Sequence, residues 1–161
     1  MDIEFLRKVS LFKGLNEEGL KALAELCFTR EFAKEGVIIL AEQEGDTLFI
    51  IREGQVKVCI SSEEGREVIL SLLGPGAVFG ELALLDGKLR SANVVATDET
   101  SLVMLRRSDF QQLICKTPQI AMALLAELAG RLRRTDRQIE GLALLDVTSR
   151  ISETLLQLAD D

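Results

Sequence analysis

The sequence predicts a domain of the α+β class that is mainly β, with an antiparallel sandwich or barrel preceded by one helix and followed by others. The first observation is a central region, from about residue 28 to residue 107, in which short runs rich in Val, Ile and Phe alternate with glycine-containing turns. The second is an apolar pattern at helical spacing before this region. The third is a longer helical pattern after it.

Length and composition limit the architecture. The 161 residues suffice for one domain with a hydrophobic core and are too few for two comfortable ones. A hydrophobic fraction of 47% indicates an ordered globular chain rather than a disordered one. No apolar run approaches the length of a membrane span, and the N-terminus lacks the basic start and apolar block of a signal peptide. We therefore expect a cytoplasmic protein without membrane contact.

Missing and scarce residue types narrow the function. The chain contains no histidine, which removes the commonest general base and the commonest metal ligand. We therefore expect neither an enzyme nor a metal site, and a barrel enzyme of the cupin type, which needs a histidine-rich metal centre, is disfavoured. Cys27, Cys59 and Cys115 have neither metal-ligand nor disulfide spacing and are expected to be small buried hydrophobes. The net charge of −7 argues against direct nucleic-acid binding by this chain.

Local patterns justify each element in turn. Asn16 is the predicted N-cap of the first helix, in which Leu20 and Leu23 share one face. Turns are expected at SSEEG, residues 61–65, and at GPG, residues 74–76. The predicted strands are the runs GVIILA, TLFIIREG, QVKVCIS, REVILSLL, SANVVAT and TSLVMLRR.

Two further helices follow the strands. Ser108 is expected to cap the first, and the second is predicted to begin at Thr117 and Pro118, because Thr suits the N-cap and Pro the first turn. Apolar positions along the second helix step by four and three residues: Ala121, Leu125, Leu128, Leu132, Thr135, Ile139 and Leu142. This spacing is that of a coiled-coil seam and predicts a homodimer through residues 118–143. The alternative is a helix that packs its apolar face on its own domain.

Polar residues interrupt an apolar region between residues 80 and 92. Gly80 lets the backbone approach a ligand, and the helical turn after it presents unpaired N–H groups. Arg90 supplies a forked cationic donor and Ser91 a hydroxyl, which together suit a phosphate. Glu81 would repel a phosphate but can accept hydrogen bonds from sugar hydroxyls. These residues predict a nucleotide site, and a surface Glu81–Arg90 ion pair is the alternative.

The segment FGELALLDGKLRSA, residues 79–92, resembles the phosphate-binding cassette of the cyclic nucleotide-binding domain. The similarity continues through LFKGL, residues 11–15, and REVILSLLGPGAVFGELALL, residues 66–85. The segment RLRRTDRQIEGLALLDVTSRISETLLQLA, residues 131–159, is similar to the CRP/FNR branch of transcription regulators, the catabolite activator family.

This resemblance implies an antiparallel β-roll, a jelly-roll-like double-stranded β-helix, with an N-terminal helix and a long C-terminal dimerisation helix. It divides the chain into a nucleotide-binding part at residues 1–116, a dimerisation helix at residues 117–145, and the start of a truncated DNA-binding region at residues 146–161.

The resemblance also implies roles for individual residues. The residues implied to hold the cyclic phosphate are Gly80, Arg90, Ser91 and Ala92, and the one implied to hold the ribose is Glu81. The residues implied to line the pocket are Val58, Leu70, Ser71 and Leu82. Thr135 would contact the base, and Asp136 would reach the nucleotide bound in the other subunit. From the residues alone, Thr135 can instead set the register of the seam, and Asp136 can face Arg131 of a partner helix.

The function implied by the resemblance is that of a regulatory and dimerisation domain that senses a cyclic nucleotide, with cAMP as effector and no metal. It would control allosterically a DNA-binding domain that lies outside this chain. The alternative is a stand-alone module that senses cGMP or a cyclic dinucleotide such as c-di-GMP. Asp136 replaces the serine usual in the catabolite activator pattern. Because a carboxylate pairs better with the two adjacent donors of guanine than with the adenine amino group, a guanine ligand stays open.

Overall fold

The computed structural model describes residues 2–62 and 64–144. The chain divides into two compact units, Met1–Ala121 and Met122–Asp161. The described part of the second unit is the remainder of the last helix. The predicted boundary between residues 116 and 117 stays a prediction, and the predicted DNA-binding segment at residues 146–161 lies outside the described residues.

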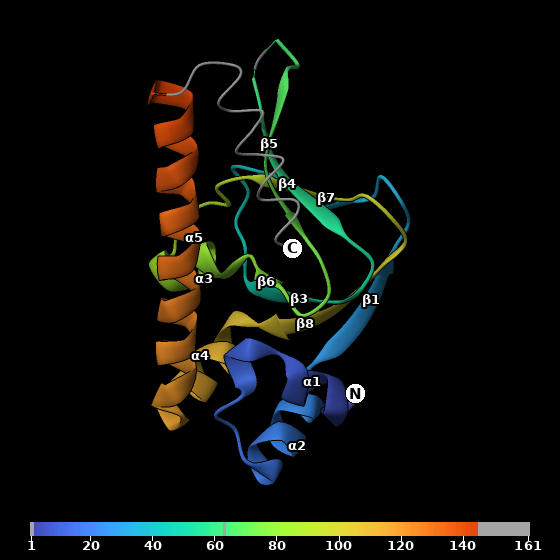
Figure 1. The fold of residues 1–161 in the computed structure, drawn as a ribbon. Helices are drawn as coiled ribbons and strands as arrows, with labels where there is room; N and C mark the ends of the chain where they lie inside the picture. The colour runs from blue at the N-terminus through green and yellow to red at the C-terminus, as the bar shows by residue number, and fades with distance from the viewer. Residues whose placement is uncertain (1, 63, 145–161) are drawn as a thin grey trace. The chain divides into compact units, whose positions relative to one another are not determined.

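Helices precede and follow the strands in the chain order, and one short helix lies between two of the strands (Figure 1). The helices are α1 (Ile3–Lys8), a 3-10 turn η1 (Ser10–Phe12), α2 (Glu17–Leu26), α3 (Glu81–Asp86), α4 (Arg107–Lys116) and α5 (Pro118–Leu144). The strands are β1 (Phe28–Phe32), β2 (Val37–Ile39), β3 (Thr47–Glu53), β4 (Val56–Ser61), β5 (Glu67–Leu73), β6 (Val78–Phe79), β7 (Asn93–Ala96) and β8 (Thr100–Arg106).

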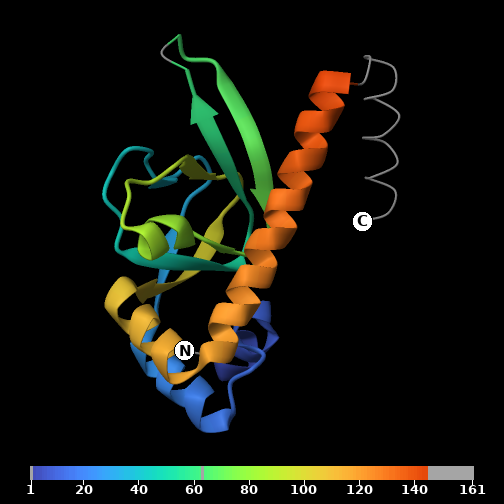
Figure 2. The same cartoon turned by 90° about the vertical axis from the view of Figure 1, so that its left-hand side faces the viewer.

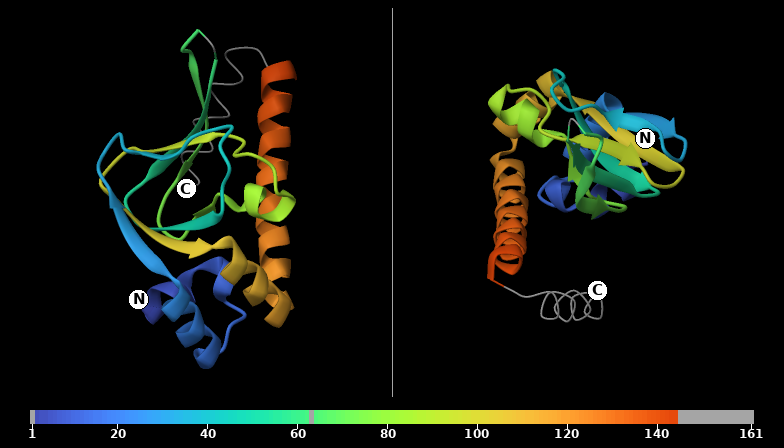
Figure 3. Two further views of the ribbon diagram at one scale, coloured as in Figure 1. Left: turned by 180° about the vertical axis from the view of Figure 1, so that it is seen from behind. Right: turned by 90° about the horizontal axis from the view of Figure 1, so that it is seen from above.

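The strands form two four-stranded sheets, both antiparallel throughout. One has the order β1-β8-β3-β6 and the other β2-β7-β4-β5. Figures 1 and 3 show the two sheets facing each other in the first unit. The buried residues between them are Ile39, Phe49, Ile51, Val56, Phe79, Val94, Leu102 and Met104. This architecture confirms the predicted mainly β, antiparallel β-roll fold.

The apolar runs become strands whose burial differs according to their position. In β3, Leu48–Ile51 is buried without interruption, as expected for a strand with both faces covered. In β5, an edge strand, Glu67–Leu72 is exposed throughout. Figure 2 shows the β4–β5 hairpin extending beyond the neighbouring strands. The sequence did not single out β1 and β6, because β1 is largely polar and β6 has only two residues.

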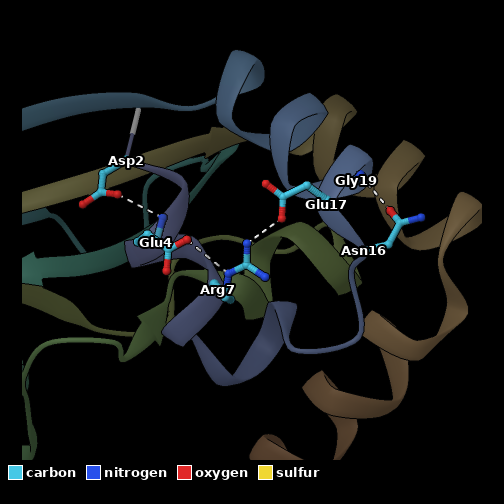
Figure 4. Close-up of polar contacts among 6 residues, drawn as sticks. All are labelled: Asp2, Glu4, Arg7, Asn16, Glu17 and Gly19. Atoms are coloured by element: carbon cyan, nitrogen blue, oxygen red, sulfur yellow. Dashed lines mark hydrogen bonds and ion pairs between the residues drawn. The ribbon is translucent and has the colours of Figure 1, made fainter.

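The N-terminal helices are fixed by polar contacts at their ends (Figure 4). Asn16 caps α2, because its side-chain oxygen accepts a hydrogen bond from the backbone N–H of Gly19 at 2.9 Å, and the predicted cap is confirmed. Arg7 donates to Glu17 at 2.5 Å, which lowers the pKa of the Glu17 carboxyl. This ion pair is exposed, so its contribution to stability is small.

One predicted helix start is wrong. α4 begins at Arg107, with Arg106 as an N-cap that makes no side-chain capping bond, rather than after Ser108. The backbone N–H of Arg107 instead donates to the carbonyl oxygen of Asp46 at 2.6 Å. A tertiary contact therefore sets this helix terminus in place of the local capping residue.

The cysteines differ in their surroundings. Cys59 is buried, as predicted. Cys27 is partly buried, and burial raises the pKa of its thiol to about 12, so it stays a protonated thiol. Cys115 is exposed, and the prediction that it is buried is wrong. It lies near the end of α4, where one helical face contacts solvent.

The described residues contain no group of three or more His, Cys, Asp and Glu side chains placed to hold a metal ion. Among the same residues, no single helix has the length and apolar character needed to cross a membrane. Only α4 and α5 taken together, with the bend between them, satisfy that test of length and composition.

Candidate functional site

The site begins where β6 runs into α3. Gly80 is the residue before the helix and has φ +80°, in the left-handed region that favours glycine. A Cβ at this position would lie 2.6 Å from Nη1 of Arg90 and 3.2 Å from the carbonyl oxygen of Thr47. A side chain is therefore excluded here by both backbone conformation and space. Glycine is required where the chain passes this close to the arginine.

Arg90 is the central side chain of the site. Its Nη1 donates to the carbonyl oxygen of Gly80 at 2.6 Å, and its Nη2 donates to the carbonyl oxygen of Thr47 at 2.8 Å. The backbone of the same residue is also fixed, since its N–H donates to Gln43 O at 2.8 Å and its carbonyl accepts from Glu42 N at 2.9 Å. Arg90 is only 8% exposed. Two hydrogen bonds thus hold the buried guanidinium, and two more hold the backbone of the same residue.

The electrostatics of Arg90 reflect this burial. Loss of solvent lowers the pKa of the guanidinium, while the carboxylates of Asp46 and Glu81 act in the opposite direction. A guanidinium keeps its charge at neutral pH even so. A buried, permanently charged donor with a forked geometry is suited to an oxyanion such as a phosphate.

Glu81 is the first residue of α3 and is 3% exposed. Its negative charge acts on Arg90 across the site. Because both side chains are buried, they do not form the surface ion pair that was the alternative interpretation. A buried carboxylate beside a buried cation can accept hydrogen bonds from hydroxyl groups of a ligand. This is the role predicted for the ribose-binding residue.

Ser91 and Ala92 follow Arg90 at the entrance to β7. Ser91 is exposed and Ala92 is 9% exposed. The structure therefore brings Gly80 and Arg90 into direct contact and places Ser91 and Ala92 next to Arg90 along the chain. The assignment of these residues to a phosphate stays a prediction.

The predicted pocket-lining residues come from two regions. Val58 on β4 and Ser71 on β5 are direct register partners, and Leu70 precedes Ser71 on the same strand. Leu70 is 43% exposed and Leu82, on α3, is 47% exposed. These apolar side chains are thus available for contact with a ligand. Their role as a pocket lining stays a prediction.

The predicted base-binding residues lie on α5, within the second unit. Thr135 and Asp136 are both exposed. The hydroxyl of Thr135 donates to the carbonyl oxygen of Arg131 at 3.1 Å, a bond within the helix. Contact of this pair with a purine stays a prediction.

The sequence did not indicate that a second segment, residues 45–49, also contacts Arg90. This segment contains Gly45, the carbonyl of Thr47 and the ring of Phe49, whose centroid lies 5.7 Å from the Arg90 guanidinium carbon. A Cβ on Gly45 would lie 1.9 Å from Nε of Arg90, so the arginine passes directly over this glycine. A main-chain carbonyl leaves no signal in the residue types. The short motif GDT before the apolar run of β3 was the one available hint.

A separate cleft of about 630 Å³ lies close to this segment. Its lining residues are Glu44, Gly45, Asp46, Ala83, Gly87, Lys88, Leu89 and Arg107. None of the residues predicted to hold the phosphate or ribose lines it. The cleft shares Gly45 and Asp46 with the surroundings of Arg90, but it is not the predicted nucleotide site.

The chain is similar to known proteins over most of its length. The family model for the cyclic nucleotide-binding domain matches residues 29–116. The chain is 40% identical over 134 residues to the cAMP-activated global transcriptional regulator CRP of Pasteurella multocida, over 83% of this chain and 64% of that protein. It is 33% identical over 156 residues to the CRP-like cAMP-activated global transcriptional regulator of Mycobacterium tuberculosis, over 97% of this chain and 70% of that protein.

The fold is also similar to that of a solved structure. The catabolite activator protein of Thermus thermophilus superposes with a TM-score of 0.74 at 36% identity, over 83% of this chain and 63% of that chain. The present chain therefore spans less than two thirds of the Pasteurella and Thermus proteins.

Proposed function

Because the chain belongs to the cyclic nucleotide-binding domain family, in its CRP branch, we propose that it is the sensor and dimerisation part of a transcription regulator and that its effector is cAMP. The regulator would work in the cytoplasm, and the chain would bind its effector without catalysing a reaction. DNA would be recognised by a domain that follows the described residues in the whole regulator.

The observation that carries this proposal is the anchoring of Arg90. A guanidinium has five N–H groups, and carbonyl oxygens occupy one from each of two terminal nitrogens. Three N–H groups are left for a ligand, which is enough for two oxygens of one phosphate. The cation is preorganised, so a nucleotide does not need to order it on binding. The buried carboxylate of Glu81 supplies the acceptor for a ribose hydroxyl.

The helix α5 supports the dimer in this proposal. Its 27 residues would extend for about 40 Å. Four predicted seam residues are each more than half exposed: Leu125 at 58%, Leu132 at 61%, Ile139 at 59% and Leu142 at 71%. A row of exposed apolar side chains at heptad spacing is covered when a second copy of the helix pairs with it. Thr135 and Asp136 lie in this row and beside it, where a nucleotide bound near the seam would bias the dimer between two states.

Calorimetric titration tests the effector. We expect the wild-type protein to bind cAMP more tightly than cGMP, c-di-GMP or 5′-AMP, and Arg90→Ala to remove measurable binding while the far-UV circular dichroism is retained. Arg66→Ala is the control, because Arg66 is 80% exposed at the hairpin turn. Equal affinity of wild type and Arg90→Ala for cAMP would refute the site. Tighter binding of cGMP or c-di-GMP would shift the proposal to a guanine ligand, the chemistry that Asp136 favours.

The dimer and the DNA-binding role have their own measurements. In sedimentation equilibrium we expect a dimer for the wild type and a monomer for Leu132→Asp, which places a charge in the seam. In a mobility-shift assay we expect no specific operator binding by this chain. Specific DNA binding by this chain would contradict the proposal that a separate domain recognises DNA.

A further inference from the structure

Two aromatic rings lie behind the phosphate-binding arginine. Phe49 on β3 and Phe79 on β6 are register partners in the sheet. Their rings stack with centroids 5.1 Å apart and an angle of 7° between the planes. Phe49 is 5% exposed and Phe79 is 2% exposed. The stack is therefore a buried, nearly parallel pair.

Arg90 contacts this stack on one side only. The guanidinium carbon lies 5.7 Å from the centroid of the Phe49 ring, within the range of a cation–π interaction. No cation contact involves Phe79 among the ring contacts of the described residues. Because the surroundings are buried, the attraction between the cation and the ring is less screened than at a surface.

The two carbonyl bonds do not by themselves fix the orientation of Arg90. Hydrogen bonds to Gly80 O and Thr47 O hold two terminal nitrogens, but the guanidinium plane can still tilt about the line that joins these two acceptors. The Phe49 ring, with the guanidinium carbon above it, restricts this tilt. The direction of the three remaining N–H groups follows from the orientation of the plane.

We propose that Phe49 is a positioning residue for the phosphate-binding arginine. It sets the plane of the Arg90 guanidinium, so that the free N–H groups point to one anion, and it acts through the arginine without contacting the nucleotide itself. This inference rests on the proposed function, since it concerns how the same site binds a cyclic nucleotide.

Phe49→Leu and Phe79→Leu form the matched test. Each removes one ring from the same stack in the same pair of strands, but only the first removes the ring beside Arg90. We expect Phe49→Leu to raise the Kd for cAMP about tenfold, and Phe79→Leu to change it by about twofold or less. Phe49→Tyr keeps the ring and should bind cAMP with nearly the wild-type Kd. Phe49→Met replaces Phe49→Leu if the latter does not fold by circular dichroism.

A double-mutant cycle separates positioning from packing. If Phe49 acts through the arginine, Phe49→Leu should have little further effect on the Kd in an Arg90→Lys background. A full tenfold effect in that background, or equal effects of Phe49→Leu and Phe79→Leu in the wild type, overturns the inference. Absence of cyclic nucleotide binding by the wild type overturns the proposed function instead, and with it the role of Phe49 in that function.

Discussion

Arg90 and Thr47 are joined by a hydrogen bond of 2.8 Å between the guanidinium and a main-chain oxygen, across 43 positions of the sequence. This contact connects the segment that resembles a phosphate-binding cassette to the first residue of β3. A side chain on one segment is thus oriented by the backbone of another. The site is built from both segments and not from the cassette alone.

Replacing Arg90 by lysine keeps the charge but removes the fork. A lysine ammonium cannot donate to Gly80 O and Thr47 O and still present two N–H groups to a phosphate. We expect Arg90→Lys to weaken cAMP binding at least about tenfold. Calorimetric titration measures the loss. Arg52→Lys, at a half-buried position on β3, is the control and should bind as the wild type does.

Gly80→Ala should abolish nucleotide binding. The alanine would have to adopt φ near +80°, and its Cβ would lie 2.6 Å from Nη1 of Arg90, so the guanidinium would have to move. The left-handed conformation alone costs about 1–2 kcal/mol of stability. Gly76→Ala is the matched control, because Gly76 has φ +84° with no atom within 4 Å of the new Cβ. Thermal unfolding should show a lower Tm for both variants, whereas only Gly80→Ala should lose nucleotide binding. Wild-type affinity of Gly80→Ala for cAMP would contradict the site geometry.

The Lys57–Glu67 pair should make stability depend on acid pH. Lys57 donates to Glu67 at 2.7 Å, and this bond lowers the pKa of the Glu67 carboxyl from 4.5. Because the folded-state pKa is the lower one, the stabilisation is complete above about pH 4.5 and is lost as pH falls through the folded pKa. We expect Glu67→Gln to lower Tm by about 1–3 °C at pH 7.

Thermal melts at several pH values check this prediction. The difference in Tm between wild type and Glu67→Gln should shrink below pH 4.5. Glu64→Gln removes the same charge from a carboxylate that is 74% exposed and should leave Tm nearly unchanged. A difference between wild type and Glu67→Gln that is constant from pH 7 to pH 3 would mean that the ion pair does not contribute.

Thr135→Leu should act on both proposed roles of α5. Leucine packs better than threonine in a coiled-coil seam, so we expect tighter dimerisation by about threefold or more. Loss of the hydroxyl should at the same time weaken binding of the purine. Sedimentation equilibrium and calorimetry measure the two effects, and Thr135→Ser, which keeps the hydroxyl, is the control. Weaker dimerisation of Thr135→Leu would show that the heptad register is wrong.

Much of the fold follows from periodicity in the sequence. The continuous apolar run of β3 and the capped start of α2 are local patterns, and both were predicted correctly. β1 was not recognised, because its residues Phe28–Phe32 are stabilised by pairing with β8 rather than by a local apolar pattern. The start of α4 was misplaced because a bond from Arg107 to Asp46 determines it. Elements defined by distant partners are not visible in a local pattern.

In the candidate site, too, the residues close together in the sequence were predicted and the contributions from a distant segment were not. Gly80, Glu81, Arg90 and Ser91 stand close together in the sequence, and their residue types carry the chemistry. Gly45 contributes by having no side chain, and Thr47 contributes a main-chain oxygen. Phe49 contributes a ring that cannot be told from an ordinary core residue in the sequence. Such contributions can be identified only when the two segments are seen together.

The exposed apolar strand β5 has a consequence for handling the protein. Five residues of the β4–β5 hairpin are more than two fifths exposed: Ile60, Val68, Ile69, Leu70 and Leu72. An edge strand of this kind, which carries a charge only at Glu67, offers free backbone donors and acceptors to any other extended chain. We therefore expect the protein to aggregate slowly at high concentration, which is measured as turbidity that increases with time and with protein concentration. We expect Leu70→Lys, which interrupts the apolar run of β5 with a positive charge, to delay the onset of this turbidity.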